Sequence, residues 1–288
     1  MTTTALKPQS TSRWIAAKTA GMPTQDGAGV SLTRMVGTPQ LQDLDPILML
    51  DVIRSDDPKG YIAGFPEHPH RGFETVTYML DGRMRHKDNH GNQGVLVPGS
   101  VQWMTAGRGI VHSEMPEQTE GKMRGFQLWL NLPAKDKMTA PAYQEFGPEK
   151  MPVVERTGVN IKVIAGQVDG VTGPVRQPAT DPTYLDVRID AGAEFTLPIP
   201  AGHAAFIYVY EGSAAVGIGR EAATISAQEL AVLGDGTEVR LEGRAARSRA
   251  IVVAGRPLRE PVARYGPFVM NTREEIMQAF ADYQSGKF

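Results

Sequence analysis

The chain contains no cysteine among its 288 residues. Disulfide bonds and thiolate metal ligands are therefore excluded, and a structural zinc site is disfavoured because such sites are usually rich in sulfur. The chain also lacks an apolar run of about 18 residues, the length that a membrane-spanning helix needs, and its first residues include no apolar segment typical of a secretory signal. Because a cysteine-free chain suits a reducing compartment, we expect a cytoplasmic protein that does not enter membranes.

An excess of positive charge is missing as well. The sequence has 30 Lys and Arg residues against 32 Asp and Glu residues, which gives a formal net charge of −2. Direct nucleic-acid binding usually needs a basic surface, so we expect no direct contact with nucleic acid. A hydrophobic fraction of 41%, with 31 glycines and 21 prolines, describes a loop-rich globular protein of one large or two ordinary domains.

Turn residues recur at short intervals and separate short runs rich in β-branched and aromatic residues. Asp81-Gly82 and Pro98-Gly99 are two such turns, and residues 73–80 and 101–105 are two such runs. Many short strands with regular turns indicate a sandwich or a barrel. The expected fold class is therefore all-β.

One convincing helical pattern lies near the C-terminus. Thr272 and Glu275 form a capping box, Ile276 and Phe280 mark one apolar face, and a glycine at the end supplies a stop. This pattern predicts a helix at about 272–286, docked on a sheet or across a domain boundary.

The second half of the chain looks like a copy of the first. A shift of 130 residues aligns residues 73–82 with residues 203–212 and retains an acidic residue followed by glycine at the end of both segments. The same shift places His68-Pro69-His70 on Pro198-Ile199-Pro200. The copy therefore retains strands but loses the histidines.

This repeat predicts two similar β domains, of which only the first binds metal. The Pro- and Gly-rich stretch 133–152 is the expected boundary. We accordingly assign residues 1–145 to an N-terminal metal-binding domain. Residues 146–288 form a C-terminal domain without metal ligands that ends in the helix.

Two short segments supply the candidate metal ligands: His68-Pro69-His70 and His112-Ser113-Glu114. Side chains at positions i and i+2 of a strand leave the same face, so neighbouring strands could direct three imidazoles and one carboxylate at one ion. Such a ligand set suits one divalent transition metal, with Fe(II), Mn(II), Ni(II), Cu(II) and Zn(II) all chemically suitable. Open coordination positions would imply reactivity or ligand sensing.

Other polar residues compete for these roles. Glu74, four residues after His70, would share its face in a regular strand, so spacing alone does not exclude it as a ligand. We prefer Glu114 as the ligand and expect Glu74 to orient an imidazole through its second nitrogen. For His86 and His90 we expect a solvated hairpin, and for His203 a structural role.

Four segments of the chain resemble those of the pirin family, within the cupin superfamily. They are residues 65–78 (FPEHPHRGFETVTY), 98–116 (PGSVQWMTAGRGIVHSEMP), 127–133 (QLWLNLP) and 265–272 (YGPFVMNT). In many cupins the carboxylate ligand follows the second histidine after four intervening residues, and Thr75 occupies that position here. Pirin-like proteins take it from the second motif instead, which corresponds to Glu114.

The resemblance implies a bicupin of two β-barrels with a C-terminal helix, in which iron is held by His68, His70, His112 and Glu114. It also implies a second barrel without metal. A substrate pocket beside the metal would include Phe65 and Gln127.

Two functions follow from the resemblance. Bacterial pirin-like proteins are associated with quercetin 2,3-dioxygenase activity, so the first is Fe(II)-dependent cleavage of a flavonol by O2, with Glu114 accepting the proton of the substrate hydroxyl. The second is an iron-binding, redox-sensitive regulatory protein that acts through a protein partner.

Overall fold

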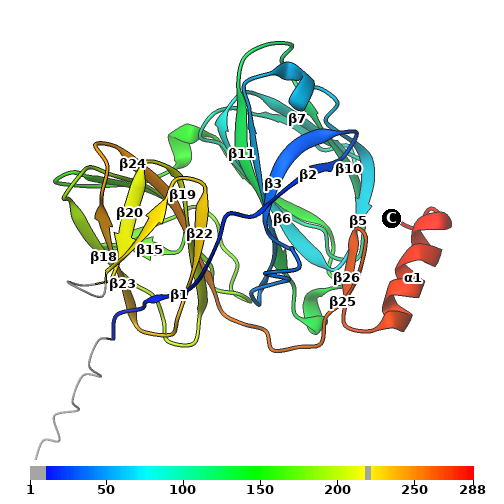
Figure 1. Ribbon diagram of the computed structural model, residues 1–288. Coiled ribbons are helices and arrows are strands. Elements are labelled where there is room, and N and C mark those ends of the chain that lie inside the picture. Colours follow the sequence, from blue (N-terminus) through cyan, green and yellow to red (C-terminus); the bar gives the residue numbers. More distant parts are fainter. Residues whose placement is uncertain (1–10, 218–221) are drawn as a thin grey trace, which may run out of the picture.

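The structure is a computed structural model that describes residues 11–217 and 222–288 (Figure 1). Strands form most of it, and the described residues contain one α-helix, α1 (Arg273–Gln284). Three short 3₁₀ turns lie at Pro58–Gly60, Ala134–Asp136 and Pro148–Lys150. The all-β prediction is confirmed. No helix in the described part of the chain has the length and apolarity needed to cross a bilayer.

The first barrel combines a seven-stranded and a four-stranded sheet. The large sheet has the order β12 (Ala142–Phe146), β9 (Val101–Thr105), β6 (Phe73–Asp81), β11 (Met123–Asn131), β4 (Ile47–Ser55), β3 (Val30–Val36) and β2 (Met22–Asp26). The small sheet has the order β5 (Phe65–His70), β10 (Ile110–Pro116), β7 (Met84–Asp88) and β8 (Gln93–Leu96).

The second barrel repeats this plan. Its large sheet has the order β1 (Ile15–Thr19), β22 (Glu229–Leu233), β19 (Ala204–Glu211), β24 (Ser248–Gly255), β17 (Thr183–Ile189), β14 (Val159–Ala165) and β13 (Val153–Arg156). Its small sheet has the order β18 (Glu194–Pro198), β23 (Glu238–Gly243), β20 (Ser213–Val216) and β21 (Ala223–Ser226). Two short hairpins complete the strands: β15 (Gln167–Val168) with β16 (Val171–Thr172), and β25 (Ala263–Tyr265) with β26 (Phe268–Met270).

The aligned repeat corresponds to equivalent strands. β6 and β19 each take the third position of a seven-stranded sheet, and β5 and β18 each begin the four-stranded sheet beside it. The shift of 130 residues places Pro198, the last residue of β18, on His68, and Pro200, just beyond β18, on His70, the last residue of β5. The second barrel therefore has the strand of the histidine motif without its histidines.

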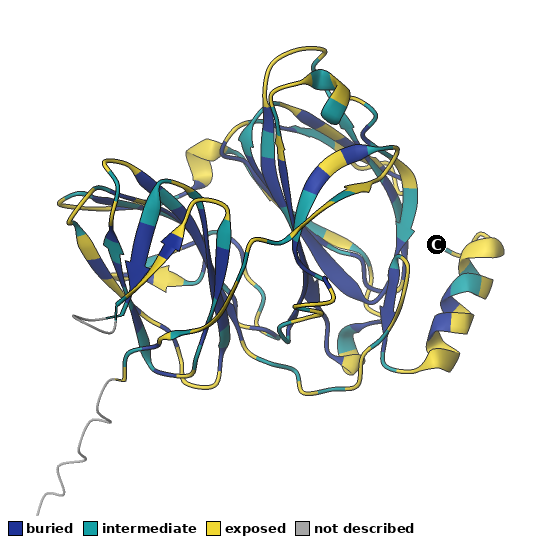
Figure 2. Ribbon diagram, in the orientation of Figure 1, coloured by how far each residue is buried: buried dark blue, intermediate teal, exposed yellow. Residues whose placement is uncertain are grey.

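The two large sheets pack against each other through one apolar cluster. It includes Val76 and Phe126 of the first barrel together with Phe206 and Ile251 of the second. A separate cluster fills the inside of the second barrel. The buried residues form the dark bands along both barrels in Figure 2. Because β6 lies between this interface and the interior of the first barrel, Phe73–Met79 is buried on both faces.

The two ends of the chain cross the proposed division at residue 145. β1 pairs with β22 of the second barrel, while α1 and β26 lie against the first barrel beside β5 (Figure 1). The helix begins as expected, since Thr272 Oγ1 accepts from the Glu275 amide and the Glu275 carboxylate accepts from the Thr272 amide. The division into residues 1–145 and 146–288 remains a proposal.

A buried junction ties the C-terminal segment to the turn after His70. Lys137 Nζ donates to the carbonyl of Gly72 (2.7 Å), to Asn131 Oδ1 (2.6 Å) and to the carbonyl of Val269 (3.1 Å). The Val269 amide donates to the carbonyl of Arg71 (3.0 Å). The turn between β5 and β6 is therefore fixed by residues far away in the sequence.

Replacement of Gly72 by alanine should destabilise the protein strongly. Gly72 has a φ of +89°, and a Cβ there would lie 1.9 Å from the Val269 carbonyl oxygen. Gly91, with a φ of +90°, has no atom within 4 Å of such a Cβ. We expect Gly91→Ala to cost about 1 kcal/mol from backbone strain alone, and Gly72→Ala at least about 2 kcal/mol more from the clash. Urea unfolding of both variants measures this difference, and equal costs would contradict the close approach.

The stability should depend on the ionisation of Lys137. Burial lowers the pKa of its ammonium group to about 8 from 10.5. Between these values the unfolded chain binds the proton more often than the folded chain, so the free energy of unfolding rises with pH. Relative to Lys137→Met, wild type should gain about 2 kcal/mol between pH 8 and pH 10.5. The control is Lys135→Met, at an exposed neighbour: relative to this variant, wild type should gain no stability between pH 8 and pH 10.5. Denaturant titrations measure both differences.

Candidate metal centre

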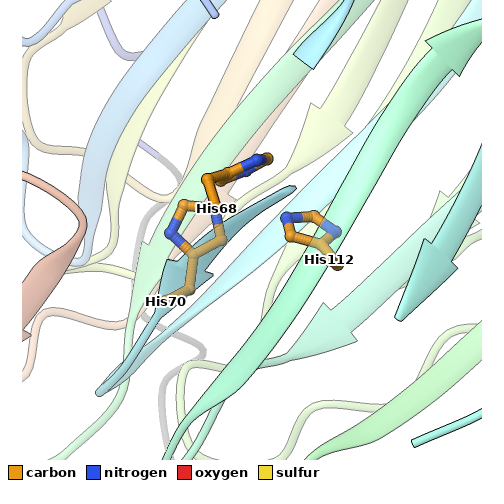
Figure 3. A group of neighbouring side chains, drawn as sticks. All are labelled: His68, His70 and His112. Atoms are coloured by element: carbon orange, nitrogen blue, oxygen red, sulfur yellow. The ribbon is translucent and has the colours of Figure 1, made fainter. Parts of the chain in front are cut away.

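Three histidines converge on one point inside the first barrel. In the antiparallel pairing of β5 with β10, His112 lies opposite His68 and Ile110 lies opposite His70. The candidate ligand nitrogens of the three imidazoles all lie within 4.8 Å of one another. Figure 3 shows His68 and His70 on one strand, with His112 facing them from its neighbour. Within residues 11–217 and 222–288, this is the one group of three or more such side chains.

Strand alternation produces this convergence. In β10, Ile110, His112 and Glu114 are buried and the residues between them are more exposed, as expected for side chains that alternate between two faces. The pairing of β10 with β5 shifts between His112 and Glu114, while its pairing with β7 stays regular. The predicted H-x-H and H-x-E steps thus lie on neighbouring strands.

The imidazoles of His70 and His112 are suited to bind a cation because burial keeps them neutral. Burial, followed by the charge of His68, lowers the pKa of His70 well below its usual value. Burial, followed by the charge of His70, does the same to the pKa of His112. Both rings are therefore unprotonated near neutral pH and carry a nitrogen lone pair for a metal.

Backbone carbonyls set the tautomers on β5. His68 Nδ1 lies 2.8 Å from the carbonyl oxygen of Pro66, and His70 Nδ1 lies 3.4 Å from that of Pro267. A carbonyl only accepts, so each Nδ1 carries the proton and each Nε2 is left with a lone pair. His112 is fully buried, and neither of its ring nitrogens has a hydrogen-bond partner among the described residues. Three such nitrogens fit a divalent transition metal.

Glu114 lies beside this group but outside it. Its Oε1 accepts from the Thr77 hydroxyl (2.9 Å), and its Oε2 lies 3.4 Å from Gln127 Nε2. The carboxylate is buried and lines the same cavity as His68 and His70. It is therefore placed to complete a ligand set or to accept a proton from a molecule in the cavity.

The cavity has a volume of about 670 Å³ and opens beside the histidines. Phe65 and Gln127, the two residues expected in a substrate pocket, both line it. Trp129 adds a flat apolar wall, and the Arg264 guanidinium lies 4.8 Å from the centre of its ring. Ligand sites of roughly 300–1,000 Å³ accept drug-sized molecules, so this cavity is large enough for a molecule of several rings.

Glu74 does not take the place that its spacing suggested. Its Oε1 accepts from Thr105 Oγ1 (2.6 Å) and from Gln177 Nε2 (2.6 Å), and the described residues show no hydrogen bond between it and an imidazole. The chain turns at Gly72, so His70 and Glu74 belong to different strands and the even spacing between them carries no information about their faces. Burial raises the pKa of the Glu74 carboxyl.

The other histidines lie outside the group. His90 is exposed, as expected for a hairpin. His86 is not solvated: it is buried, and its Nε2 lies 2.7 Å from Glu145 Oε2, because alternation along β7 places it on the buried face of that strand. His203 belongs to the second barrel, where its carbonyl accepts from Arg13 Nη1 (2.9 Å).

Two contributors were missed in the sequence. Thr77 holds Glu114, and Pro267 contacts His70 from the C-terminal segment. The segment 265–272 resembles a family motif, but the sequence did not predict that it lies beside the site. Thr77 stands in a buried strand like any β-branched residue, so no local signal distinguishes it.

Known proteins match almost the whole chain. The family model for pirin matches residues 29–130, and that for the pirin C-terminal cupin domain matches residues 184–288. A pirin-like protein of Caulobacter vibrioides is 54% identical over 270 residues, which cover 93% of this chain and 96% of that protein.

The chain belongs to the pirin family.

Two further matches carry names that refer to an activity. A Pseudomonas aeruginosa protein named "Putative quercetin 2,3-dioxygenase" is 52% identical over 271 residues, 92% of this chain and 94% of that protein. A solved structure of quercetin 2,3-dioxygenase from Acinetobacter baumannii has a TM-score of 0.88 at 32% identity, covering 96% of this chain and 99% of that one. As a pirin, the chain thus shares its fold with a protein of that name.

Loss of one imidazole should abolish metal binding. Removal of a residue that merely supports a ligand lowers metal affinity by about 10–100-fold, so His70→Ala and His112→Ala should each lower it by at least about 100-fold. The exposed His90, replaced by alanine, should leave it unchanged. Elemental analysis after dialysis against Fe(II), Mn(II), Ni(II), Cu(II) or Zn(II) measures the effect. Equal metal content in all three variants would rule out this centre.

Proposed function

We propose that the protein is a metal-dependent dioxygenase that cleaves flavonols such as quercetin with O2. The observation that supports this most is the convergence of three imidazoles beside a cavity of about 670 Å³, which His68 and His70 line. The names of two relatives point to the same substrate class. A cytoplasmic location remains a prediction.

In this proposal His68, His70 and His112 hold one divalent ion, for which we propose Fe(II), with Glu114 as the carboxylate of the set. A bound divalent metal supplies Lewis acidity, which lowers the pKa of a hydroxyl group that it coordinates. The Pro66 and Pro267 carbonyls keep the two β5 imidazoles in the tautomer that such binding needs.

The remaining residues would bind the flavonol and move its proton. Phe65 and Trp129 offer apolar surface to a flat ring system. Glu114, fixed by Thr77 and Gln127, would accept the proton of the substrate 3-hydroxyl, because a general base must lie within reach of that proton. The electron-rich ring would then react with O2, whose two oxygen atoms enter the ring-opened product as carbon monoxide leaves.

The direct test is aerobic incubation of the iron-loaded protein with quercetin. We expect quercetin and O2 to be consumed in equal amounts, with release of carbon monoxide, and no turnover in His70→Ala. If the wild-type protein forms no more ring-opened product than His70→Ala, the proposal fails.

The role of Glu114 can be tested separately from metal binding. Glu114→Gln retains an oxygen that can accept from Thr77 but removes the base, so turnover should fall by about 10²–10⁴-fold. The measurement compares turnover per bound metal ion, which separates loss of the base from loss of the ion. Unchanged turnover per ion would assign the proton to another acceptor.

That the protein also acts as an iron-binding, redox-sensitive regulator with a protein partner remains a prediction. A pull-down that compares Fe(II)-loaded with Fe(III)-loaded protein would test it, and partners independent of the iron state would contradict it.

A further inference from the structure

A second cavity, of about 340 Å³, lies on the second barrel and is strongly basic. Four of its six lining residues are cationic and one is a carboxylate; the six are Asn160, Lys162, Asp186, Arg188, Arg247 and Arg249. Five of them come from β14, β17 and β24, three neighbouring strands of the large sheet, and Arg247 directly precedes β24. None of them belongs to the cavity beside the histidines.

The register of these strands places like charges side by side. Asn160 lies opposite Arg188, and Arg188 lies directly opposite Arg249 on the next strand. Like charges at directly opposed positions destabilise a sheet. Arg249 also has a carboxylate on its other side, because Glu211 lies opposite it on β19. Arg188 is therefore the member of the pair whose charge a bound anion would offset.

The single carboxylate of the cavity is already engaged. Asp186 is buried, and it accepts from the Tyr78 hydroxyl (2.7 Å) and from the Tyr210 hydroxyl. Arg249 Nη2 lies 3.6 Å from its Oδ2. Asp186 therefore balances one cation of the cavity, Arg249.

The remaining cations are poorly balanced. Among the residues that the structure describes, no carboxylate lies within 4.0 Å of the charged nitrogens of Lys162 or Arg247, and Arg188 reaches only the exposed Asp190, at 3.9 Å. An exposed ion pair at that distance contributes little to stability and compensates little of the charge of Arg188. Arginine side chains bind phosphate and carboxylate groups through paired N–H donors, and a lysine adds a point charge.

We propose that this cavity is a binding site for a small polyanion, a molecule with two or more adjacent phosphate or carboxylate groups. Several cations around one concave space favour multiple negative charges over a single one. The volume lies at the lower end of the roughly 300–1,000 Å³ of small-molecule sites, which favours a compact ligand. The site is independent of the proposed dioxygenase activity.

Isothermal titration calorimetry of the full chain at 0.15 M salt tests the proposal, with tripolyphosphate and citrate as probes. We expect saturable binding of one anion per chain, weakened by about tenfold or more in Arg188→Gln and in Lys162→Gln, because each variant loses a charged donor. The probe that binds more tightly shows whether the cavity prefers phosphate or carboxylate groups. Absence of saturable binding for both probes would overturn the proposal.

Two controls make the result specific. Arg244→Gln removes the same charge from an exposed ion pair of the second barrel, with Glu242 at 2.9 Å, and should bind as wild type does. If anion affinity fell equally in Arg244→Gln, the effect would come from net charge alone, and the proposed site would be overturned. His68→Ala should retain the binding, whereas its loss there would place the anion on the metal centre instead.

Thermal unfolding gives a second readout. Without anion, Arg188→Gln should melt no lower than wild type, because it relieves the opposed pair of arginines. With anion, wild type should gain more in melting temperature than Arg188→Gln. An equal gain in both proteins would mean that the anion acts elsewhere.

Discussion

The antiparallel pairing of β5 with β10 is the constraint on which the rest of the site depends. It places His112 opposite His68 and so directs side chains 44 residues apart in the sequence at one point. A slip of one residue would turn every side chain of β10 to the other face and bring Val111 or Ser113 to the position of His112. β7 pairs with the other edge of β10 without a register shift, so the register of β10 is fixed from both sides.

Strand β6 separates the interior of the first barrel from the interface between the barrels. Thr77 points to the interior and bonds Glu114, whereas the next residue, Tyr78, points to the other face and bonds Asp186 of the second barrel. The strand is buried on both faces, so its polar residues Glu74, Thr75 and Thr77 are buried together with its apolar ones. The same burial raises the pKa of Tyr78 well above its usual value, so its hydroxyl stays a donor to Asp186.

Local spacing predicted the histidines because strand periodicity places the two residues of each motif on one face, and the pairing of β5 with β10 then brings the two motifs together. The same reasoning failed for Glu74, because a two-residue turn at Gly72 separates it from His70 and places it toward Gln177 of the second half. It also failed for His86, which lies on the buried face of β7, between the exposed residues Arg85 and Lys87. The contacts of β1 with β22 and of Pro267 with His70 join residues about 200 apart, and no periodicity carries that information. The family motif identified residues 265–272 but did not predict that they lie beside His70.

Burial of the histidine cluster without a cation lowers the stability of the folded chain, and this links stability to metal binding. His112 is buried, and neither of its ring nitrogens has a hydrogen-bond partner within residues 11–217 and 222–288. A buried polar group without a partner costs about 1–3 kcal/mol. Protonation offers no relief, because burial and the neighbouring imidazoles oppose a positive charge on the ring. A metal that binds only the folded chain removes this penalty and stabilises the fold in proportion to the logarithm of its concentration. The junction of Lys137, Gly72 and Val269 anchors the turn that directly follows His70, and so connects the C-terminal segment to the strand that carries two of the imidazoles.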